Sequence, residues 1–307
     1  MTGSAMAATP LALVTQRFLR HRLALVSAGV LAVLAAASLF APAVEGWLGL
    51  DVNAVDLFNR LAPPSAAHPL GTDEAGRDVL LRLLYGGRVS LFVGIAAALT
   101  AAVLGTAVGL LSGYFGGRLD ALFMRLTDGV IALPLLPLLI VLAAIDLQKL
   151  GFSAEAAQAE SMSLYRIVVI VALVGWTTVA RLVRATALSL RERPFVLAAR
   201  AQGASSFRIM TVHILPNLAS PIIVATTLSV GNVILLESVL SFLGLGIQPP
   251  LPSWGNLLTN AQELIWDAPA LAVYPGLAIF VTVIAFNFVG DGLQDALDPR
   301  SLERGKR

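Results

Sequence analysis

The feature that most constrains this chain is a set of six long, almost uncharged apolar stretches, at residues 23–41, 89–111, 129–145, 164–183, 218–236 and 270–289. About 20 apolar helical residues are enough to cross the ~30 Å hydrocarbon core of a bilayer. Charged residues make up only 13% of the chain, too few to cover such stretches in a water-soluble domain. The sequence therefore predicts an all-α integral membrane protein with six transmembrane helices.

The first stretch has a competing interpretation as a cleavable signal peptide. Ala41, Pro42 and Ala43 are similar to a small-residue cleavage site. The apolar run, however, is longer than the usual ~7–15 residues of a signal peptide, and it begins only at Leu23. We therefore favour a first transmembrane helix that is retained.

The distribution of Lys and Arg predicts that both termini are cytoplasmic. Cytoplasmic loops of membrane proteins are enriched in these residues. With this orientation, only six of the 21 fall outside: Arg60, Arg77, Arg82, Arg88, Lys149 and Arg166. The expected segments are a cytoplasmic segment 1–22, a first helix 23–41, an outer segment 42–88, a five-helix core 89–293 and a cytoplasmic tail 294–307. Within the core lie an inner loop, 184–217, and an outer loop, 244–269.

The charge and residue content exclude several classes of function. The formal net charge of +2 combines a basic inner side with an acidic outer side, so the chain needs no nucleic-acid partner. It has no Cys and only three His, which excludes thiolate chemistry and makes a metal centre unexpected. We find neither a phosphate-binding loop nor a Ser–His or paired-Asp constellation inside the spans. The chain is therefore expected to be non-catalytic, with no cofactor of its own.

A stand-alone secondary transporter is the main alternative to a subunit of a larger transport system. Such a transporter is expected to show inverted repeats and broken helices with charges near the bilayer midplane. The spans here carry few charges and show no such repeat. We therefore rank this alternative second.

The inner loop is rich in Arg and Ala and has the pattern of a helix–glycine–helix elbow. Pro194 suits the first turn of a short helix, and Gly203 can end that helix in a left-handed conformation. A second short helix is expected to run to about Ile214 and to end at Pro216. By residue pattern alone, an amphipathic helix lying in the bilayer interface is also open.

This loop resembles the cytoplasmic signature of the inner-membrane permease subunits of ABC importers. Ala198 and Ala199 are followed after three residues by Gly203, and after nine more by His213-Ile-Leu-Pro216. Leu197 stands where the family usually has an acid. Residues 68–88, 237–256 and 287–300 resemble, more specifically, the C-type permeases of dipeptide, oligopeptide and nickel importers.

The resemblance implies a type I importer permease fold in the bacterial inner membrane, with a cytoplasmic coupling helix. It implies four partners: a second, B-type permease, two ATPase subunits that hold ATP and Mg, and an extracytoplasmic substrate-binding protein. The implied cargo is a di- or oligopeptide, with nickel chelates or another small solute as the alternative. The residues implied in coupling to the ATPase are Ala198, Ala199, Arg200, Gly203, Ala204, His213, Leu215 and Pro216.

A few polar residues in or near the spans are further candidates. Glu237 and Asn232 are candidates for the translocation path or a gate. For Glu237 a structural role is favoured and a position at the interface is also open, and for Asn232 a hydrogen bond between helices is the more common role. Arg125 and Asp128 have the spacing of a helical ion pair. At the outer side, Thr72 and Asp73 are expected to cap a helix that starts near Glu74. Finally, Gly105 and Gly109 fit a close helix-packing motif.

Overall fold

The computed structural model describes residues 10–298, and no β-strand occurs among them. The longer helices are α2 (Arg22–Leu39), α4 (Val79–Phe115), α5 (Gly117–Ala132), α8 (Glu160–Leu190), α11 (Leu215–Phe242) and α13 (Ala270–Leu297). The shorter ones are α1 (Pro10–Arg20), α3 (Ala41–Leu48), α6 (Leu135–Ala143), α7 (Ala154–Gln158), α9 (Pro194–Ala201), α10 (Ser206–Arg208) and α12 (Ala261–Leu264). The expected all-α class is confirmed.

Five helices are long and apolar enough to cross a membrane: α2, α4, α8, α11 and α13. They confirm five of the six expected spans. The sixth is not the continuous helix over 129–145 that the apolar run predicted. The chain instead forms α5 and α6, which bend by 91° at Leu133 and Pro134. A proline lacks the amide hydrogen and disfavours helical backbone in the preceding residue, so the helix breaks there.

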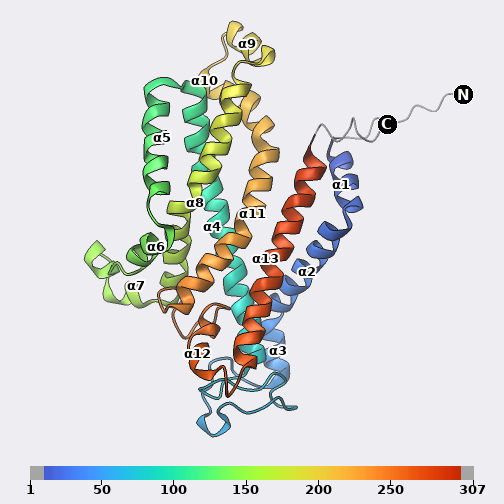
Figure 1. Ribbon diagram of the computed structural model, residues 1–307, viewed down its shortest axis with the longest axis vertical. Helices are drawn as coiled ribbons and strands as arrows, with labels where there is room; N and C mark the ends of the chain where they lie inside the picture. Colours follow the sequence, from blue (N-terminus) through green and yellow to red (C-terminus); the bar gives the residue numbers. More distant parts are fainter. Residues whose placement is uncertain (1–9, 299–307) are drawn as a thin grey trace, which may run out of the picture.

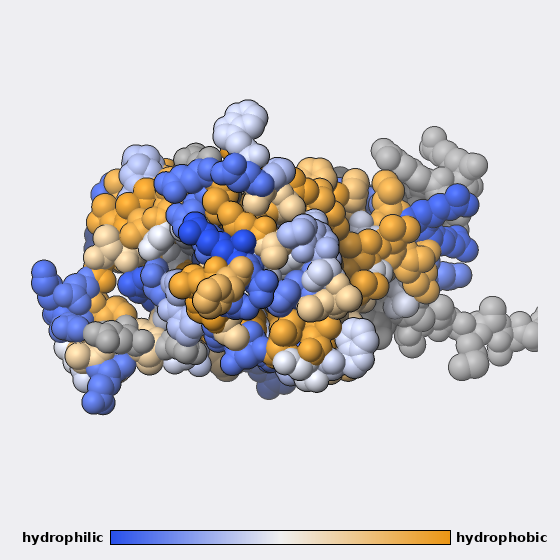
Figure 2. All heavy atoms as spheres, turned by 90° about the horizontal axis from the view of Figure 1, so that it is seen from below, coloured by the Kyte–Doolittle hydropathy of each residue, from blue (hydrophilic) through white to orange (hydrophobic). Residues whose placement is uncertain are grey.

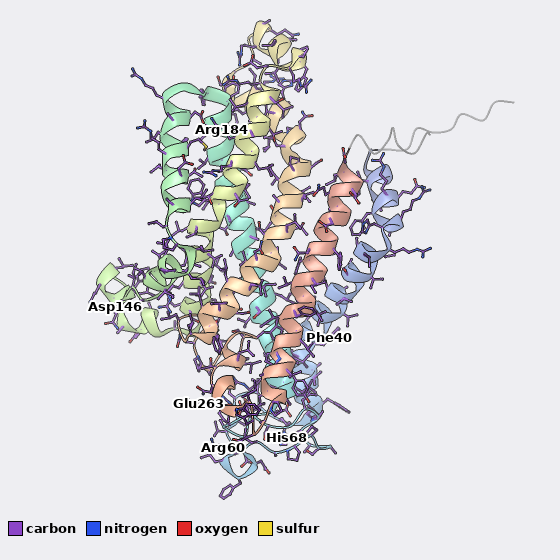
Figure 3. The ribbon with its side chains drawn as sticks, viewed as in Figure 1. Phe40, Arg60, His68, Asp146, Arg184 and Glu263 are labelled. Atoms are coloured by element: carbon purple, nitrogen blue, oxygen red, sulfur yellow. The ribbon has the colours of Figure 1, made fainter. Side chains whose placement is uncertain are left out.

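The long helices lie side by side along the longest axis of the molecule (Figure 1). We call the end that carries α9 and α10 the elbow end, and the opposite end, with α3, α12 and residues 49–78 and 243–269, the loop end. Helix α1 and the last turns of α13 lie toward the elbow end. Among labelled side chains, Arg184 lies toward the elbow end, whereas Arg60, His68 and Glu263 lie at the loop end (Figure 3).

Helices α4 and α8 approach each other closely along a row of glycines. Gly105, Gly109 and Gly113 are spaced four residues apart, so they share one face of α4. A Cβ added at Gly105 would lie 2.5 Å from the carbonyl oxygen of Trp176. At Gly113 it would lie 2.8 Å from that of Arg184. The expected packing motif is therefore confirmed, and it is one glycine longer than expected.

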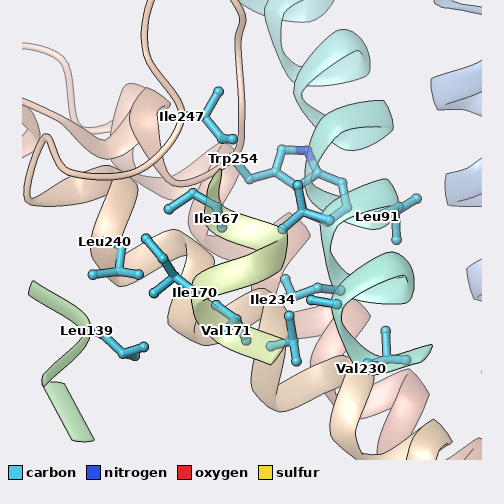
Figure 4. Close-up of a cluster of buried hydrophobic side chains, with 14 of the residues drawn as sticks. Leu91, Leu139, Ile167, Ile170, Val171, Val230, Ile234, Leu240, Ile247 and Trp254 are labelled. Carbon is cyan, nitrogen blue, oxygen red and sulfur yellow. The ribbon is translucent and has the colours of Figure 1, made fainter. Parts of the chain in front are cut away.

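Two hydrophobic clusters hold the bundle together. The first joins α4, α6, α8, α11, α13 and the outer loop, and includes Leu139, Ile167, Ile234 and Trp254 (Figure 4). The second lies toward the elbow end and joins α4, α8 and α11 to the elbow. Trp254 shows how the outer loop is tied to the bundle, because its indole Nε1 donates to the carbonyl oxygen of Leu83, 3.0 Å away.

Candidate functional site

The elbow comprises residues 194–214, with α9, the turn after it, α10 and a π-helical segment (Ile209–Ile214). Pro194 occupies the first turn of α9, as its fixed φ favours. Gly203 has a φ of +81°, in the left-handed region that ends helices. Ser205 then caps the next helix, because its hydroxyl oxygen accepts from the amide of Arg208. The expected helix–glycine–helix arrangement is confirmed.

Pro216 does not end the second helix, in contrast to the expectation. It lies in the first turn of α11, and residues 206–242 form one long helical path. A proline ring clashes with the carbonyl group four residues earlier, and the π-helical turn just before Pro216 relieves that clash. Asn217 adds a side-chain hydrogen bond from its Nδ2 to the carbonyl oxygen of His213, 2.7 Å away.

The non-helical connection is shorter than the expected loop 184–217. Helix α8 continues to Leu190, and the helical path toward α11 begins at Ser206. The Ala-rich residues that follow Arg184 have high helix propensity and extend α8 beyond its apolar run. The elbow is thus joined directly to two membrane-spanning helices, with little flexible chain between.

The elbow is packed firmly onto the ends of the bundle. Val196, Ile209 and Ile214 are at most 1% exposed, and they contact the cluster that includes Leu110 of α4 and Val183 of α8. The guanidinium group of Arg200 also lies 5.8 Å from the centre of the Tyr114 ring, within the range of a cation–π contact. A force on α9 therefore reaches α4, α8 and α11 through side-chain contacts.

The free side of the elbow presents exposed apolar side chains. Phe195, Leu197 and Phe207 are 44%, 45% and 73% exposed. The nearby side chains of Arg193 and Arg208 are exposed as well. We call these five residues the elbow tip. The sequence pointed to Leu197 only as a departure from the family signature and not to the other four, although large apolar residues in a short, polar connection are a usable signal for a partner surface.

The residues implied in coupling fall into two groups. Ala198, Arg200 and Gly203 are exposed on the elbow, and Ala199 and Ala204 are half-buried beside them. The amide of Ala204 donates to the carbonyl oxygen of Ala199 at 3.0 Å, which closes the turn around Gly203. The second group, His213, Leu215 and Pro216, lies where the π-helical segment joins α11. Only the first group lies beside the elbow tip in the sequence.

Ion pairs brace the helices behind the elbow. The guanidinium group of Arg184 in α8 binds the carboxylate of Asp120 in α5, with an Nη2–Oδ2 distance of 2.6 Å. The hydroxyl of Ser112 in α4 donates to the same carboxylate. The guanidinium group of Arg191 donates to the carbonyl oxygen of Gly113, 3.2 Å away, at the end of α4. These bonds link α4, α5 and α8 near the elbow.

The expected ion pair of Arg125 with Asp128 is wrong. Asp128 pairs instead with Arg181 of α8, with an Nη2–Oδ1 distance of 2.5 Å. The residues of the expected pair lie three apart on α5, which would allow a pair within that helix. Asp128 is exposed on α5, but the guanidinium group of Arg181 in α8 reaches its carboxylate, so the partner is a cation from another helix.

Glu237 is fully buried toward the loop end of the bundle. Its Oε1 accepts from the hydroxyl of Ser241 at 2.7 Å, and its Oε2 accepts from the hydroxyl of Ser90 at 3.1 Å. The hydroxyl oxygen of Ser90 in turn accepts from the backbone amide of Trp254. Glu237 thereby ties α11 to α4 and to the outer loop, and of its open roles the geometry supports the structural one.

Asn232, the other candidate for the path, is exposed on α11. It lines a cavity of about 280 Å³ beside the α5–α6 break, together with Thr177, Thr178 and Ser229. These are the polar groups on an otherwise apolar wall. Asn232 thus keeps the accessibility that a residue of the path requires.

The caps expected at the outer side are placed differently in the structure. Helix α4 begins at Val79, and its cap is Asp78, whose Oδ1 accepts from the amide of Leu81 at 2.8 Å. Asp73 instead accepts from the amides of Ala75 and Arg77, which stabilises a turn before the helix. In the described part of the chain, no group of three His, Asp or Glu side chains is arranged to hold a metal ion.

Comparison with known proteins places this arrangement among transport proteins. Residues 105–303 match the family described as binding-protein-dependent transport system inner membrane component. Residues 9–64 match the N-terminal transmembrane domain of oligopeptide transport permease C. An inward-facing structure of the MetNI methionine ABC transporter has the same fold, with a TM-score of 0.55 at 18% identity over 71% of this chain and 96% of that one.

Curated relatives match nearly the whole chain. The dipeptide transport system permease protein of Alkalihalophilus pseudofirmus is 40% identical over 92% of this chain and 87% of its own. The glutathione transport system permease protein of Pectobacterium atrosepticum is 39% identical over 93% and 89%. The oligopeptide transport system permease protein of Bacillus subtilis is 36% identical over 92% and 88%.

Proposed function

We propose that this chain, which belongs to the family of binding-protein-dependent transport system inner membrane components, imports di- or oligopeptides and couples that transport to ATP hydrolysis through its elbow. The chain is a multi-pass, non-catalytic permease subunit of an ABC importer in the bacterial inner membrane. The peptide cargo is proposed from the names of its dipeptide and oligopeptide relatives.

The elbow tip is the observation that carries the coupling proposal. Its Phe and Leu side chains are exposed, and α9, which carries Phe195 and Leu197, lies beyond the ends of α4 and α8 (Figure 1). A helix that lay in the bilayer interface would instead bury its apolar face beside the transmembrane helices. Exposed Phe and Leu side chains together with Arg are a favourable composition for a protein–protein interface. We infer that the tip docks on an ATPase subunit in the cytoplasm.

The rest of the elbow is attached rigidly to the transmembrane helices, so a movement of the elbow would move these helices as well. Its buried residues and the Arg184–Asp120 pair leave the elbow little freedom relative to α4, α5 and α8. In the mechanism we propose, closure of two ATPase subunits displaces this elbow and that of a second permease subunit. The attached helices then change the accessibility of a path between the two permeases, and a binding protein supplies cargo from outside. Such coupling requires each ligand to bind the two states unequally.

Reconstitution in liposomes tests this proposal. The chain is co-expressed with a second permease subunit and ATPase subunits from the same organism, purified and supplied with binding protein. We expect ATP-dependent uptake of radiolabelled dialanine or tetra-alanine, and ATPase activity that rises with binding protein and peptide. Uptake by the chain alone would contradict the importer mechanism. An assembled, ATP-driven complex that carries a nickel chelate and no peptide would overturn only the cargo.

A further inference from the structure

A cavity of about 290 Å³ lies at the loop end, away from the elbow. Its walls come from the turn before α4, the first turns of α4, the outer loop and the start of α13; Glu74, Arg82, Gln248, Asn256, Thr259 and Pro275 are among its lining residues. This volume is close to the ~300 Å³ lower limit of typical small-molecule pockets. Hydrophilic side chains gather near the centre of this end, with apolar ones around them (Figure 2).

Among the described residues that line this cavity, Arg82 is unusual because its guanidinium group is buried and has unpaired N–H donors. The residue is only 5% exposed, yet its Nε and Nη1 atoms make no hydrogen bond within the described structure. The carboxylate oxygen Oδ2 of Asp73 lies 3.4 Å from Nε, but this oxygen already accepts from Arg77 at 2.8 Å. Arg carries five N–H donors. A buried guanidinium group with unpaired donors costs desolvation free energy unless a ligand or water accepts hydrogen bonds from them.

Two other polar side chains of the cavity, those of Asn256 and Gln248, already donate to backbone carbonyl groups. The Asn256 side chain donates to the carbonyl oxygens of Ile247 and Leu251, and that of Gln248 donates to those of Gly244 and Gly246. The guanidinium group of Arg77 pairs with the carboxylates of both Asp73 and Glu74, whereas Arg82 lies beside Asp73 without a hydrogen bond from its Nε or Nη1 anywhere in the described chain. Arg82 is therefore the cationic donor left to receive a ligand.

We propose that this cavity binds a small molecule that has a free carboxylate group, and that the guanidinium group of Arg82 binds this carboxylate. A guanidinium group matches a carboxylate in charge and in the spacing of its donors, and such bonds are about twice as strong as neutral ones. The apolar side chains of Leu257, Leu264 and Leu271 line the same cavity and suit a short aliphatic body. The site does not depend on the proposed function, because the carboxylate can belong to a peptide or to another solute.

Calorimetric titration of the full chain in lipid nanodiscs tests the site. The probes are dialanine, dialanine amide, propionate and sulfate. We expect dialanine to bind at least about tenfold more tightly than its amide, because the amide lacks the charge that Arg82 receives. Measurable propionate binding would identify a general carboxylate site, whereas binding of dialanine alone would identify a peptide site. Equal binding of dialanine and its amide, equal binding of sulfate, or no binding at millimolar concentration would overturn the proposal.

Two variants locate the site. Arg82→Gln is expected to reduce dialanine affinity at least about tenfold, whereas Arg60→Gln, at an exposed position of the same outer segment, is expected to leave it unchanged. Thr259→Trp fills the cavity while Arg82 stays in place, so it tests the location even if Arg82→Gln does not fold. Wild-type affinity in a folded Arg82→Gln or Thr259→Trp protein would show that the ligand binds elsewhere.

Discussion

Gly109 of α4 lies so close to Ala180 of α8 that a Cβ at the glycine would sit 2.4 Å from the alanine carbonyl oxygen. The backbones of the two helices are thus in direct contact, with the glycines as the contact surface. Close approach of this kind gives van der Waals contact that lipid cannot supply equally well. The contact joins the elbow-bearing end of α8 to α4, so it is part of the path by which movement of the elbow spreads.

Gly109→Ala should destabilise the chain by about 1–3 kcal/mol, because the added methyl group forces the two backbones apart. Gly29→Ala in α2 is the matched control, since a Cβ there meets nothing within 4 Å. Unfolding in mixed micelles measures both. Equal stability of the two variants would mean that α4 and α8 are not in backbone contact.

Gly203→Pro should abolish coupling while the subunit still reaches the membrane. The φ of +81° is inaccessible to proline, whose ring fixes φ near −65°. The amide hydrogen that Gly203 donates to the carbonyl oxygen of Arg200 would also be lost. Gly203→Asn, which tolerates the left-handed region, should keep most activity. Peptide-stimulated ATPase activity and uptake are measured together, and normal uptake by Gly203→Pro would refute the coupling role.

Phe207→Ser should weaken binding of the ATPase subunits by about 1–3 kcal/mol, because an exposed apolar side chain at the elbow tip would lose its burial on docking. Phe58→Ser is the control, since Phe58 is fully exposed in residues 49–78 at the loop end. Affinity is measured by titrating purified ATPase onto the permease pair. The two variants should differ clearly, and an effect of Phe58→Ser alone would place the ATPase at the loop end.

Glu237→Ala should cost about 1–3 kcal/mol of stability, because it leaves the buried hydroxyls of Ser90 and Ser241 without their acceptor. Glu237→Gln keeps an acceptor oxygen and nearly the same shape, so it should retain most of the stability and transport. Thermal unfolding and peptide uptake are compared for both. If Glu237→Gln abolished uptake in a protein of normal stability, the carboxylate would have a role in transport rather than in structure.

Labelling in intact cells checks the orientation, and the chain suits it because it contains no cysteine of its own. A membrane-impermeant maleimide should label Ala66→Cys at the loop end in intact cells. It should reach Ser206→Cys in the elbow only after permeabilisation. Both native residues are exposed, and the variants are expressed without ATPase subunits, so that accessibility to the reagent differs by side alone. The reverse pattern would place the elbow outside and rule out docking to a cytoplasmic ATPase.

Several properties of this protein could be predicted from the sequence alone, because they depend only on the residues of one segment and not on its neighbours in the fold. A bilayer accepts a helix according to its own apolar length, so five spans could be placed without knowledge of their neighbours. The left-handed turn at Gly203 is equally local, because few residues other than glycine adopt that conformation readily. The spacing of the elbow residues was sufficient to identify the family.

Tertiary structure decided which faces of the helices meet. Lipid tails are as apolar as a protein core, so the spans show no amphipathic pattern that marks their buried side. The partner of Asp128 and the contact between Glu237 and Ser90 depend on residues distant in the chain, and the unpaired N–H donors of Arg82 depend on how the surrounding segments fold around it. Apolar length alone predicted one helix over 129–145, and only the folded bundle showed the bend at Pro134.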